Sequence, residues 1–535
     1  MKRLYLALYS TVYTLSYGLI LLNSGIYSDD HCYAWHSPKT VEAIVGSLNI
    51  FPPVLPRFFS FFFELSHYVL IQRVIVFLCF YLSGILVYKL ANKILGETPS
   101  IIASLFFSIY PGFFLRLEIS TVHYTICYFL FYSASLLYAH ALGKKRVFSS
   151  VLATIFLFTS YTTHSLIFFS PVLVAYLWLL NRQAAFKPRE LGVPIGLISI
   201  ATILYILVQT IYFPQTNYHK IRFDIVNLLI LHAVSYYRSL FLTINESIHL
   251  LFNYTVTMLL LSTAIYFCLK KLYTPFKLYS NALFLFGLLA LSCGMVAYNL
   301  LGYPIGDMDL YSRHQLLVPL GAALILLAII DLVARQFKST SIFLFAAALI
   351  VACFISYNIN KFVEYQVDWY KQRSLILNFR NSELVRNNTT FVVQDCEPEL
   401  NASGRMYRIY EYTGLMKAAF GTETRYVTDY DPDPKVIMLN KTYTPNGLRF
   451  SLYYNIDDYV ESKFQALLLI TKGKTFTNTL YPLIVIIYQE FFNKQKFEKT
   501  IDEFMSVTAF PFQNGDLPFV LCGERPSRYW QLRTW

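Results

Sequence analysis

Long apolar stretches recur through the first two thirds of the chain, and they constrain its fold more than any other feature. A bilayer core of about 30 Å needs about 20 mostly apolar residues per helix. Only 14% of the 535 residues are charged, against about 25% in soluble domains, so a soluble globule is excluded. The sequence therefore predicts a polytopic α-helical membrane protein with eleven transmembrane helices, at 4–22, 68–88, 98–115, 121–142, 147–163, 164–181, 191–213, 251–269, 280–301, 314–334 and 340–357.

Basic residues gather at alternate connections between these segments, and this bias predicts the orientation. That side carries Lys2 and Arg3 at the start, a run at 144–146 and a pair at 270–271, with few acidic residues. Cytoplasmic loops carry an excess of Lys and Arg. We therefore expect the N-terminus inside and residues 358–535 outside, in a bacterial inner membrane or, in a eukaryote, the membrane of the endoplasmic reticulum.

The last third differs in composition. Residues 358–535 have the charge density of a soluble domain, and the excess of positive charge belongs to residues 1–357, where lipid topology explains it without nucleic acid. Short β-branched or apolar runs alternate with helical spacing, which predicts an extracytoplasmic α/β domain at 358–535 after a transmembrane module at 1–357. We expect strands at 390–394, 425–428, 436–439, 466–470 and 483–488, and helices at 405–420 and 489–505.

Eight cysteines bear on the compartment. Five of them lie in the predicted spans, where they read as small apolar filler. Cys396 and Cys522 lie in the outer domain, and pairing between them is open. No C-x-x-C or H-E-x-x-H spacing occurs, so spacing alone indicates no metal site.

The first polar cluster follows the first span. Asp29, Asp30 and His31 stand a few residues beyond it, on the outer side. A carboxylate there can act as general base toward a hydroxyl acceptor. A solvated acidic turn is the alternative interpretation.

The second cluster precedes the fourth span. Arg116 and Glu118 are embedded among apolar residues at the outer boundary, and His123 follows. An anion-binding role competes with a snorkelling arginine and a local ion pair.

The third cluster opens the tenth span with Asp307, Asp309, Arg313 and His314. Arginine suits phosphate oxygens because its planar fork donates two parallel hydrogen bonds. Interfacial anchoring is the alternative. His164, at the outer end of the sixth span, is an auxiliary candidate.

These clusters, on one face of a helical bundle, resemble the GT-C superfamily of integral-membrane glycosyltransferases, which use polyprenyl-phosphate-linked sugars. Asp29 and Asp30 are similar to the first acidic motif of that family. Glu118 matches its second acid by position, and Arg313 resembles its late arginine near the donor phosphate. The resemblance covers the architecture of most of the chain but only a few residues of motif, and no family signature matches in the outer domain.

The resemblance implies an inverting transfer of a sugar from a polyprenyl-phosphate donor to a protein, lipid or glycan acceptor. Asp29 or Asp30 would take the acceptor proton, with Glu118 as a second catalytic carboxylate. Arg313 and Arg116, with His314, would stabilise the departing phosphate. Some relatives use a divalent metal, for which Asp29 and Asp30 would be the ligands.

Two other functions remain open. A cell-envelope polysaccharide polymerase or ligase would also have many spans and outer arginines. A non-catalytic transporter or scaffold should carry charges near mid-membrane, where Arg73 is the one strong candidate.

Overall fold

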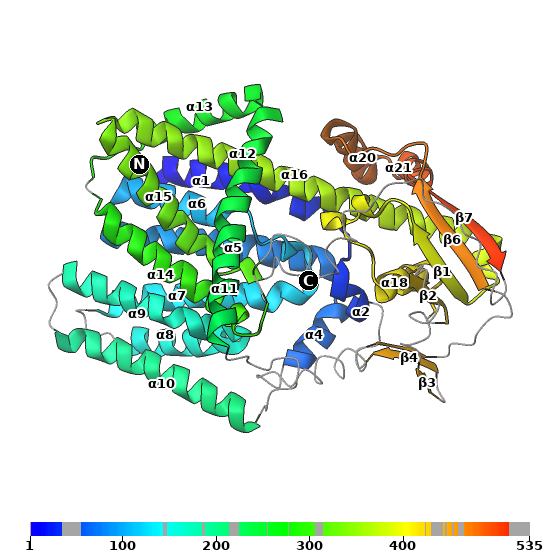
Figure 1. Cartoon of the computed structure of the whole chain (residues 1–535), viewed down its shortest axis with the longest axis horizontal. Helices are drawn as coiled ribbons and strands as arrows, with labels where there is room; N and C mark the ends of the chain where they lie inside the picture. The colour runs from blue at the N-terminus through cyan, green and yellow to red at the C-terminus, as the bar shows by residue number, and fades with distance from the viewer. Residues whose placement is uncertain are drawn as a thin grey trace. The chain divides into compact units, whose positions relative to one another are not determined.

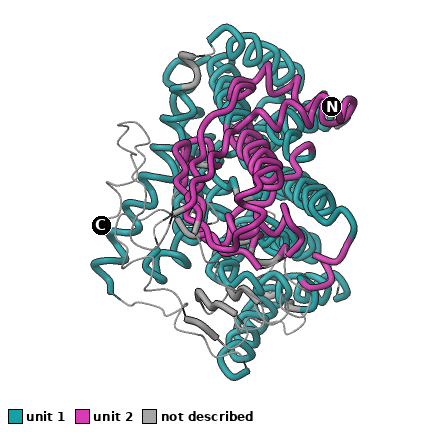
Figure 2. Tube along the Cα trace, turned by 90° about the vertical axis from the view of Figure 1, so that its right-hand side faces the viewer, with its two compact units in different colours: residues 1–21, 45–59, 66–360 teal, residues 22–44, 60–65, 361–535 magenta. Residues whose placement is uncertain are grey.

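The computed structural model forms two compact units, shown by colour in Figure 2. Unit 1 comprises Met1–Leu21, Val45–Phe59 and Ser66–Asn360, and unit 2 comprises Leu22–Ile44, Ser60–Leu65 and Lys361–Trp535. The structure describes residues 2–34, 55–142, 147–183, 188–212, 224–253, 255–276, 278–303, 305, 314–422, 424–429, 442–444, 447–451, 454–457 and 465–512.

Unit 1 is built from α-helices (Figure 1). Its described helices are α1 (Lys2–Tyr17), α4 (Leu55–Glu64, which continues into unit 2), α5 (Tyr68–Leu95), α6 (Glu97–Ile109), α7 (Val122–Ala141), α8 (Val147–Ser160), α9 (Ser165–Gln183), α10 (Pro188–Tyr212), α11 (Ile225–Tyr236), α12 (Thr243–Asn253), α13 (Thr255–Lys271), α14 (Ser280–Asn299), α15 (Val318–Gln336) and the first half of α16 (Thr340–Asn381).

Eight helical segments in the described part of the chain are long and apolar enough to cross a membrane. Seven of them coincide with predicted spans, so the chain is a polytopic helical membrane protein. The eighth, Ile225–His249, is a segment that the sequence places in the membrane interface. The remaining predicted spans correspond to α6, α7, α8 and α13, and the total of eleven spans stays a prediction.

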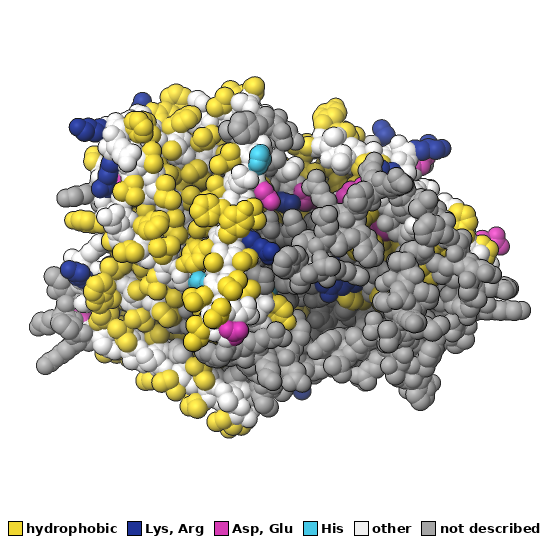
Figure 3. Space-filling model, in the orientation of Figure 1, with side chains coloured by type: hydrophobic (Ala, Val, Ile, Leu, Met, Phe, Trp, Pro, Cys, Tyr) yellow, Lys and Arg dark blue, Asp and Glu magenta, His cyan; other side chains and the backbone are white. Residues whose placement is uncertain are grey.

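Apolar side chains cover much of the surface of unit 1 (Figure 3). Examples are Leu207 on α10 and Leu260 on α13, which are 50% and 69% exposed. A water-soluble protein rarely exposes such continuous apolar surface. A helix surface of this kind suits contact with lipid chains.

Glycines let α14 and α15 pack closely. A Cβ atom added to Gly321 would lie 2.5 Å from the backbone nitrogen of Leu291 and 2.8 Å from the carbonyl oxygen of Gly287. Small residues at membrane helix interfaces allow backbones to approach in this way.

Two local breaks place candidate site residues. The predicted span 98–115 is too long, because α6 ends at Ile109 and residues 115–117 form a separate 3₁₀ turn, η3 (Leu115–Leu117). Arg116 therefore lies in a loop before α7. The polar break at 161–164 is confirmed by the 3₁₀ turn η5 (Tyr161–Thr163) and by His164, whose φ of 53° is left-handed.

Unit 2 contains two sheets. The four-stranded sheet has the order β2-β1-β6-β7, in which β1 (Thr390–Asp395) pairs parallel with β2 (Tyr426–Asp429) and β6 (Gln465–Lys472), and β7 (Met505–Phe512) is antiparallel to β6. The second sheet has three antiparallel strands, β3 (Thr442–Thr444), β4 (Gly447–Ser451) and β5 (Tyr454–Asp457). The helices of this unit are the second half of α16, α2 (His31–Ala34), α17 (Glu383–Arg386), α18 (Ile409–Phe420), α20 (Leu480–Phe492) and α21 (Lys494–Asp502).

The sequence predicts most of these elements correctly. Strands at 390–394, 425–428 and 466–470 are confirmed as β1, β2 and β6, whereas 436–439 lies outside the described residues. The helix predicted at 405–420 begins later, at Ile409, and ends as expected at Gly421, which has a φ of 73°.

The strand predicted at 483–488 is wrong. These residues belong to α20, which buries Leu483 and Ile486 on one face and exposes Tyr481 and Tyr488 on the other. A short apolar run cannot distinguish a strand from a buried helix face. The helix predicted at 489–505 is also wrong as one element: α20 ends at Phe492, α21 follows, and Met505 begins β7.

The five cysteines in predicted spans are free, as expected. Cys396, at the end of β1, is disulfide-bonded, and its partner lies outside the described residues.

Candidate functional site

The first acidic cluster belongs to unit 2. Ser28–Asp30 form a 3₁₀ turn, η2, and Asp30 and His31 are completely buried, so a freely solvated acidic turn does not describe this segment. The side chain of Asp29 lies outside the described residues. Asn23 organises the approach to the turn, because its Oδ1 accepts hydrogen bonds from the Gly25 amide (2.9 Å) and from the Tyr27 hydroxyl (2.8 Å).

Helix α18 anchors this turn. The Ser28 amide donates to Oε1 of Glu411 at 3.1 Å, and Arg405 binds both carboxylate oxygens of Glu411 at 2.5 Å. Burial alone would raise the pKa of Glu411, but Arg405 and the hydrogen bonds that Glu411 accepts hold this pKa below its ordinary value. The carboxylate is therefore a fixed anion that locks the acidic turn to the domain.

His31 is held beside the same pair. Its Nε2 lies 3.0 Å from the carbonyl oxygen of Ile26. Burial lowers the pKa of His31 to about 4, although Glu411 acts in the opposite direction. The imidazole is therefore neutral at physiological pH.

The second cluster belongs to unit 1, where Arg116 is 2% exposed. Its guanidinium lies between two aromatic rings, with the carbon atom Cζ 3.8 Å from the ring centroid of Tyr17 and 4.0 Å from that of Phe80. Its Nε donates to the carbonyl oxygen of Phe113 at 3.2 Å. Cation–π contacts of this kind hold an arginine in place without neutralising it.

Two side chains of α5 fix the loop that carries Arg116. Nε2 of Gln72 donates to the carbonyl oxygens of Arg116 (3.1 Å) and Glu118 (3.0 Å), and Arg73 donates to the carbonyl oxygen of Leu117. Gln72, Arg73 and Glu118 are all buried. The sequence gave Arg73 a mid-membrane transport role as one alternative, whereas the structure places it as a clamp on this loop.

Arg116 makes no ion pair with any described residue, and its Nη1 has no hydrogen-bond partner among them. Buried charges are normally paired, because an unpaired one loses its hydration without compensation. A buried guanidinium with an open donor is therefore suited to an anion that comes from outside the protein.

The second and third clusters meet within unit 1. A Cβ atom on Gly112 would lie 2.1 Å from Oε1 of Gln315, so the loop before α7 packs against the start of the segment that leads into α15. His314 is buried, and its ring stacks on Tyr298 with centroids 4.2 Å apart. Asp307, Asp309 and Arg313 lie outside the described residues.

The auxiliary histidines of unit 1 have local partners. Nδ1 of His123 is 3.2 Å from the carbonyl oxygen of Ser120, and His164 is 3.2 Å from the hydroxyl of Tyr205. His164 thus serves the break after α8, and these contacts do not join it to Arg116.

Among the residues that the structure describes, no group of three or more His, Cys, Asp or Glu side chains could hold a metal ion. The described part of the acidic turn offers buried Asp30 and His31, which do not make a metal site by themselves. We therefore derive no step through a metal.

Several residues of this setting are missed by sequence reasoning. Tyr17 and Phe80 flank Arg116 from α1 and α5, and Gln315 reaches Gly112 from more than 200 positions away. A polar Gln72-Arg73 pair at the start of a long apolar helix is the one local signal that could have indicated a clamp.

Comparisons with known proteins add one distant likeness. No protein-family model matches the chain, and no curated protein matches it. A crystal structure of ArnT from Cupriavidus metallidurans bound to undecaprenyl phosphate is similar over 87% of this chain and 92% of that one, with 12% sequence identity and a TM-score of 0.32. A TM-score this low carries no argument, so we base the function on the residues of the chain itself.

Proposed function

We propose that this chain is a membrane glycosyltransferase that moves a sugar from a polyprenyl-phosphate donor to an acceptor on the extracytoplasmic face. The observation that carries the proposal is Arg116, a buried guanidinium with an open donor in a rigid loop beside Glu118. An anionic group at a membrane boundary, attached to an apolar tail, satisfies both the charge of Arg116 and its apolar surroundings.

The proposed chemistry is a displacement at the anomeric carbon, with inversion. The acceptor oxygen forms a bond to that carbon while the bond from the carbon to the phosphate oxygen breaks, and the polyprenyl phosphate leaves with the electron pair. The acceptor proton passes to the carboxylate of Asp29 or Asp30. Arg116 stabilises the phosphate because its fixed charge needs no reorganisation when negative charge develops.

Other residues have supporting roles in this proposal. Arg313 and His314 add donors to the phosphate, and Glu118 is a second carboxylate near Arg116. His31, His123, His164, Asp307 and Asp309 are auxiliary. If a divalent metal is used, Asp29 and Asp30 supply its ligands.

The phosphate-binding role can be tested without knowing the sugar. Undecaprenyl phosphate is the probe, because it represents the leaving group, and undecaprenol is the same tail without phosphate. We expect Arg116→Gln to raise the Kd for the phosphate about thirtyfold, since losing a hydrogen bond to a charged group costs about 2 kcal/mol. Native mass spectrometry of the full chain measures the binding.

The matched control is Arg3→Gln, an arginine at the exposed start of α1. This variant should bind undecaprenyl phosphate like the wild type, and both proteins should bind undecaprenol weakly. Equal affinity of wild type and Arg116→Gln for the phosphate would remove Arg116 from the mechanism.

The base is tested by separate Asp29→Asn and Asp30→Asn variants. The readout is release of free polyprenyl phosphate from polyprenyl-phosphate sugars in membranes that contain the chain. We expect at least one variant to lose turnover by a factor of about 10² or more, while its binding of undecaprenyl phosphate remains. Full turnover in both variants would refute the proposed base.

A further inference from the structure

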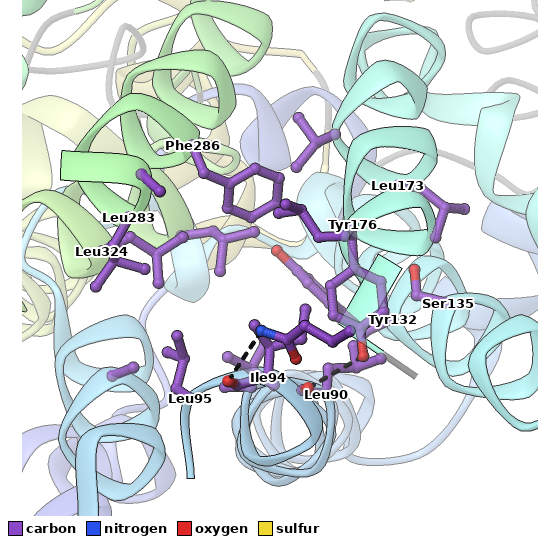
Figure 4. A pocket seen from close by; sticks show the side chains of 18 of the residues that line it. Leu90, Ile94, Leu95, Tyr132, Ser135, Leu173, Tyr176, Leu283, Phe286 and Leu324 are labelled. Atoms are coloured by element: carbon purple, nitrogen blue, oxygen red, sulfur yellow. Dashed lines mark hydrogen bonds between the residues drawn. The ribbon is translucent and has the colours of Figure 1, made fainter. Parts of the chain in front are cut away.

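A large apolar cavity lies among the helices of unit 1, and the proposed mechanism does not use it. Its volume is about 590 Å³, within the usual range of ligand pockets. Figure 4 shows side chains from α5, α7, α9, α14 and α15 around a common space. Leu90, Tyr132, Tyr176, Phe286 and Leu324 are among them.

The cavity is long and narrow. Its wall on α9 runs from Phe169 to Gln183, which at 1.5 Å per residue is about 21 Å. A volume of 590 Å³ over this length gives a mean cross-section of about 30 Å². That shape suits one extended hydrocarbon chain.

The chemistry of the wall is apolar except at one end. Two inner polar groups are already satisfied, because Tyr176 donates to the carbonyl oxygen of Leu90 and Ser135 to that of Phe131. Arg182 is the one charged residue among the described wall residues, and it is exposed at the end of α9. It makes no ion pair with a described residue.

A ligand that matches this wall has a hydrocarbon chain and one anionic group. The chain replaces contact with lipid or water along the apolar wall, and the anion pairs with the guanidinium of Arg182. Exposed Lys93, near the end of α5, adds positive charge on the same helix as the wall residue Ile94.

This cavity is separate from the loop that holds Arg116. Helix α5 contacts that loop through Arg73 and lines the cavity through Ile94. The 21 residues between these positions correspond to about 32 Å, close to the thickness of a bilayer core. A lipid with its charge at Arg182 therefore belongs to the leaflet opposite to Arg116.

We propose that the cavity binds one acyl chain of an anionic phospholipid from the leaflet at the basic, cytoplasmic ends of the helices. Arg182 holds the phosphate, and the walls from α5, α9 and α14 enclose the chain. The ligand is a resident lipid of unit 1, distinct from the donor.

The test uses the full chain in detergent, with phosphatidylglycerol and phosphatidylcholine of the same acyl chains as probes. Native mass spectrometry measures how much of each lipid stays bound. Ala91→Trp fills the cavity from α5, and Ala264→Trp is the control, because Ala264 is exposed on α13 and does not line the cavity. Arg182→Gln removes the charge alone.

We expect the wild type and Ala264→Trp to retain phosphatidylglycerol at least tenfold better than phosphatidylcholine. Ala91→Trp should lose at least tenfold of this retention, and Arg182→Gln should lose the preference between the two lipids. Equal retention of both lipids by the wild type, or unchanged retention by Ala91→Trp, would overturn the proposal. Selective retention of undecaprenyl phosphate at this cavity would overturn it as well.

A second measurement needs no variant that must fold. Phosphatidylglycerol with a photoactivatable acyl chain is added to the wild type, and crosslinked peptides are identified by mass spectrometry. We expect labels within 169–183 and 278–286, the walls on α9 and α14. Labels confined to helices outside the cavity would count against the proposal.

Discussion

At the scale of single residues, the two buried arginines of unit 1 have different surroundings. Arg73 donates to backbone and side-chain oxygens of its own unit, whereas Arg116 has two aromatic faces and an open Nη1. An arginine whose donors are used supports the fold. An arginine whose donors are open weakens the fold, and this cost is explained if the residue binds a ligand.

Thermal unfolding can distinguish these roles. Arg116→Met keeps an apolar stem between Tyr17 and Phe80 and removes an unpaired charge, so we expect an unchanged or higher Tm. Arg73→Met leaves buried oxygens without a donor, and we expect it to lose about 2 kcal/mol or more of stability. The measurement is unfolding of the purified full chain in detergent. Equal, large losses in both variants would assign Arg116 to the fold alone.

His31 gives a prediction for pH. Its pKa is about 4 in the folded chain and 6.5 when unfolded, so between these values the unfolded chain binds more protons. Stability should be full above pH 6.5 and should fall by about 3 kcal/mol as the pH drops to 4. Glu411, whose folded pKa is lowered, adds its loss only below its ordinary pKa of 4.5.

The variant His31→Gln should flatten the decline of Tm between pH 6.5 and 4.5. His67→Gln is the control, because His67 is exposed. A wild-type Tm that stays level over this interval would show that the His31 environment is not closed to protons.

At the scale of elements, sequence periodicity predicts the long helices and the buried strands, because each reads out one repeated contact with lipid or core. It fails where the same apolar run fits two elements, as in α20. It also misses the end of α6 at Ile109, because residues 111–115 are apolar enough to continue a span. That helix end is what places Arg116 in a loop.

The contact between α14 and α15 predicts a cost for one methyl group. Gly321→Ala would place a Cβ within 2.5 Å of backbone, which cannot rotate away as a side-chain tip can. We expect a loss of about 1–3 kcal/mol, the usual cost of overpacking. Gly196→Ala on α10 is the control, since nothing lies within 4 Å of its added Cβ. Comparable Tm values for both variants would contradict the close packing.

At the scale of the whole molecule, sequence reasoning names many of the site residues but not their partners. Asp30, His31, Arg116 and Glu118 are each buried, and their anchors come from distant positions such as Glu411 and Gln72. Pairings over such separations leave no local pattern, because the contact depends on the complete fold. Arg313 stays a prediction, since it lies outside the described residues.

Helix α16 offers a test at this scale. It is one helix of 42 residues, about 63 Å long, and its residues pass from unit 1 to unit 2 at Asn360. One Ala inserted after Asn360 rotates everything that follows by about 100°. We expect polyprenyl phosphate release to fall at least tenfold, because the proposed base and the proposed phosphate ligand are in different units.

The control for this insertion is one Ala after Lys338, before α16 begins. It should retain most of the activity, and both proteins should elute as a single species. Full activity after insertion at Asn360 would mean that catalysis does not depend on the continuity of α16.

The discontinuity of unit 2 also has a consequence for synthesis. The segment 22–44 is made early, but its anchor Glu411 is 383 positions beyond Ser28. At about 5–20 residues per second, the ribosome needs roughly 20–75 s to reach it. During that interval the acidic turn has been exported without its partner, so factors that guard nascent chains on the far side of the membrane should affect yield.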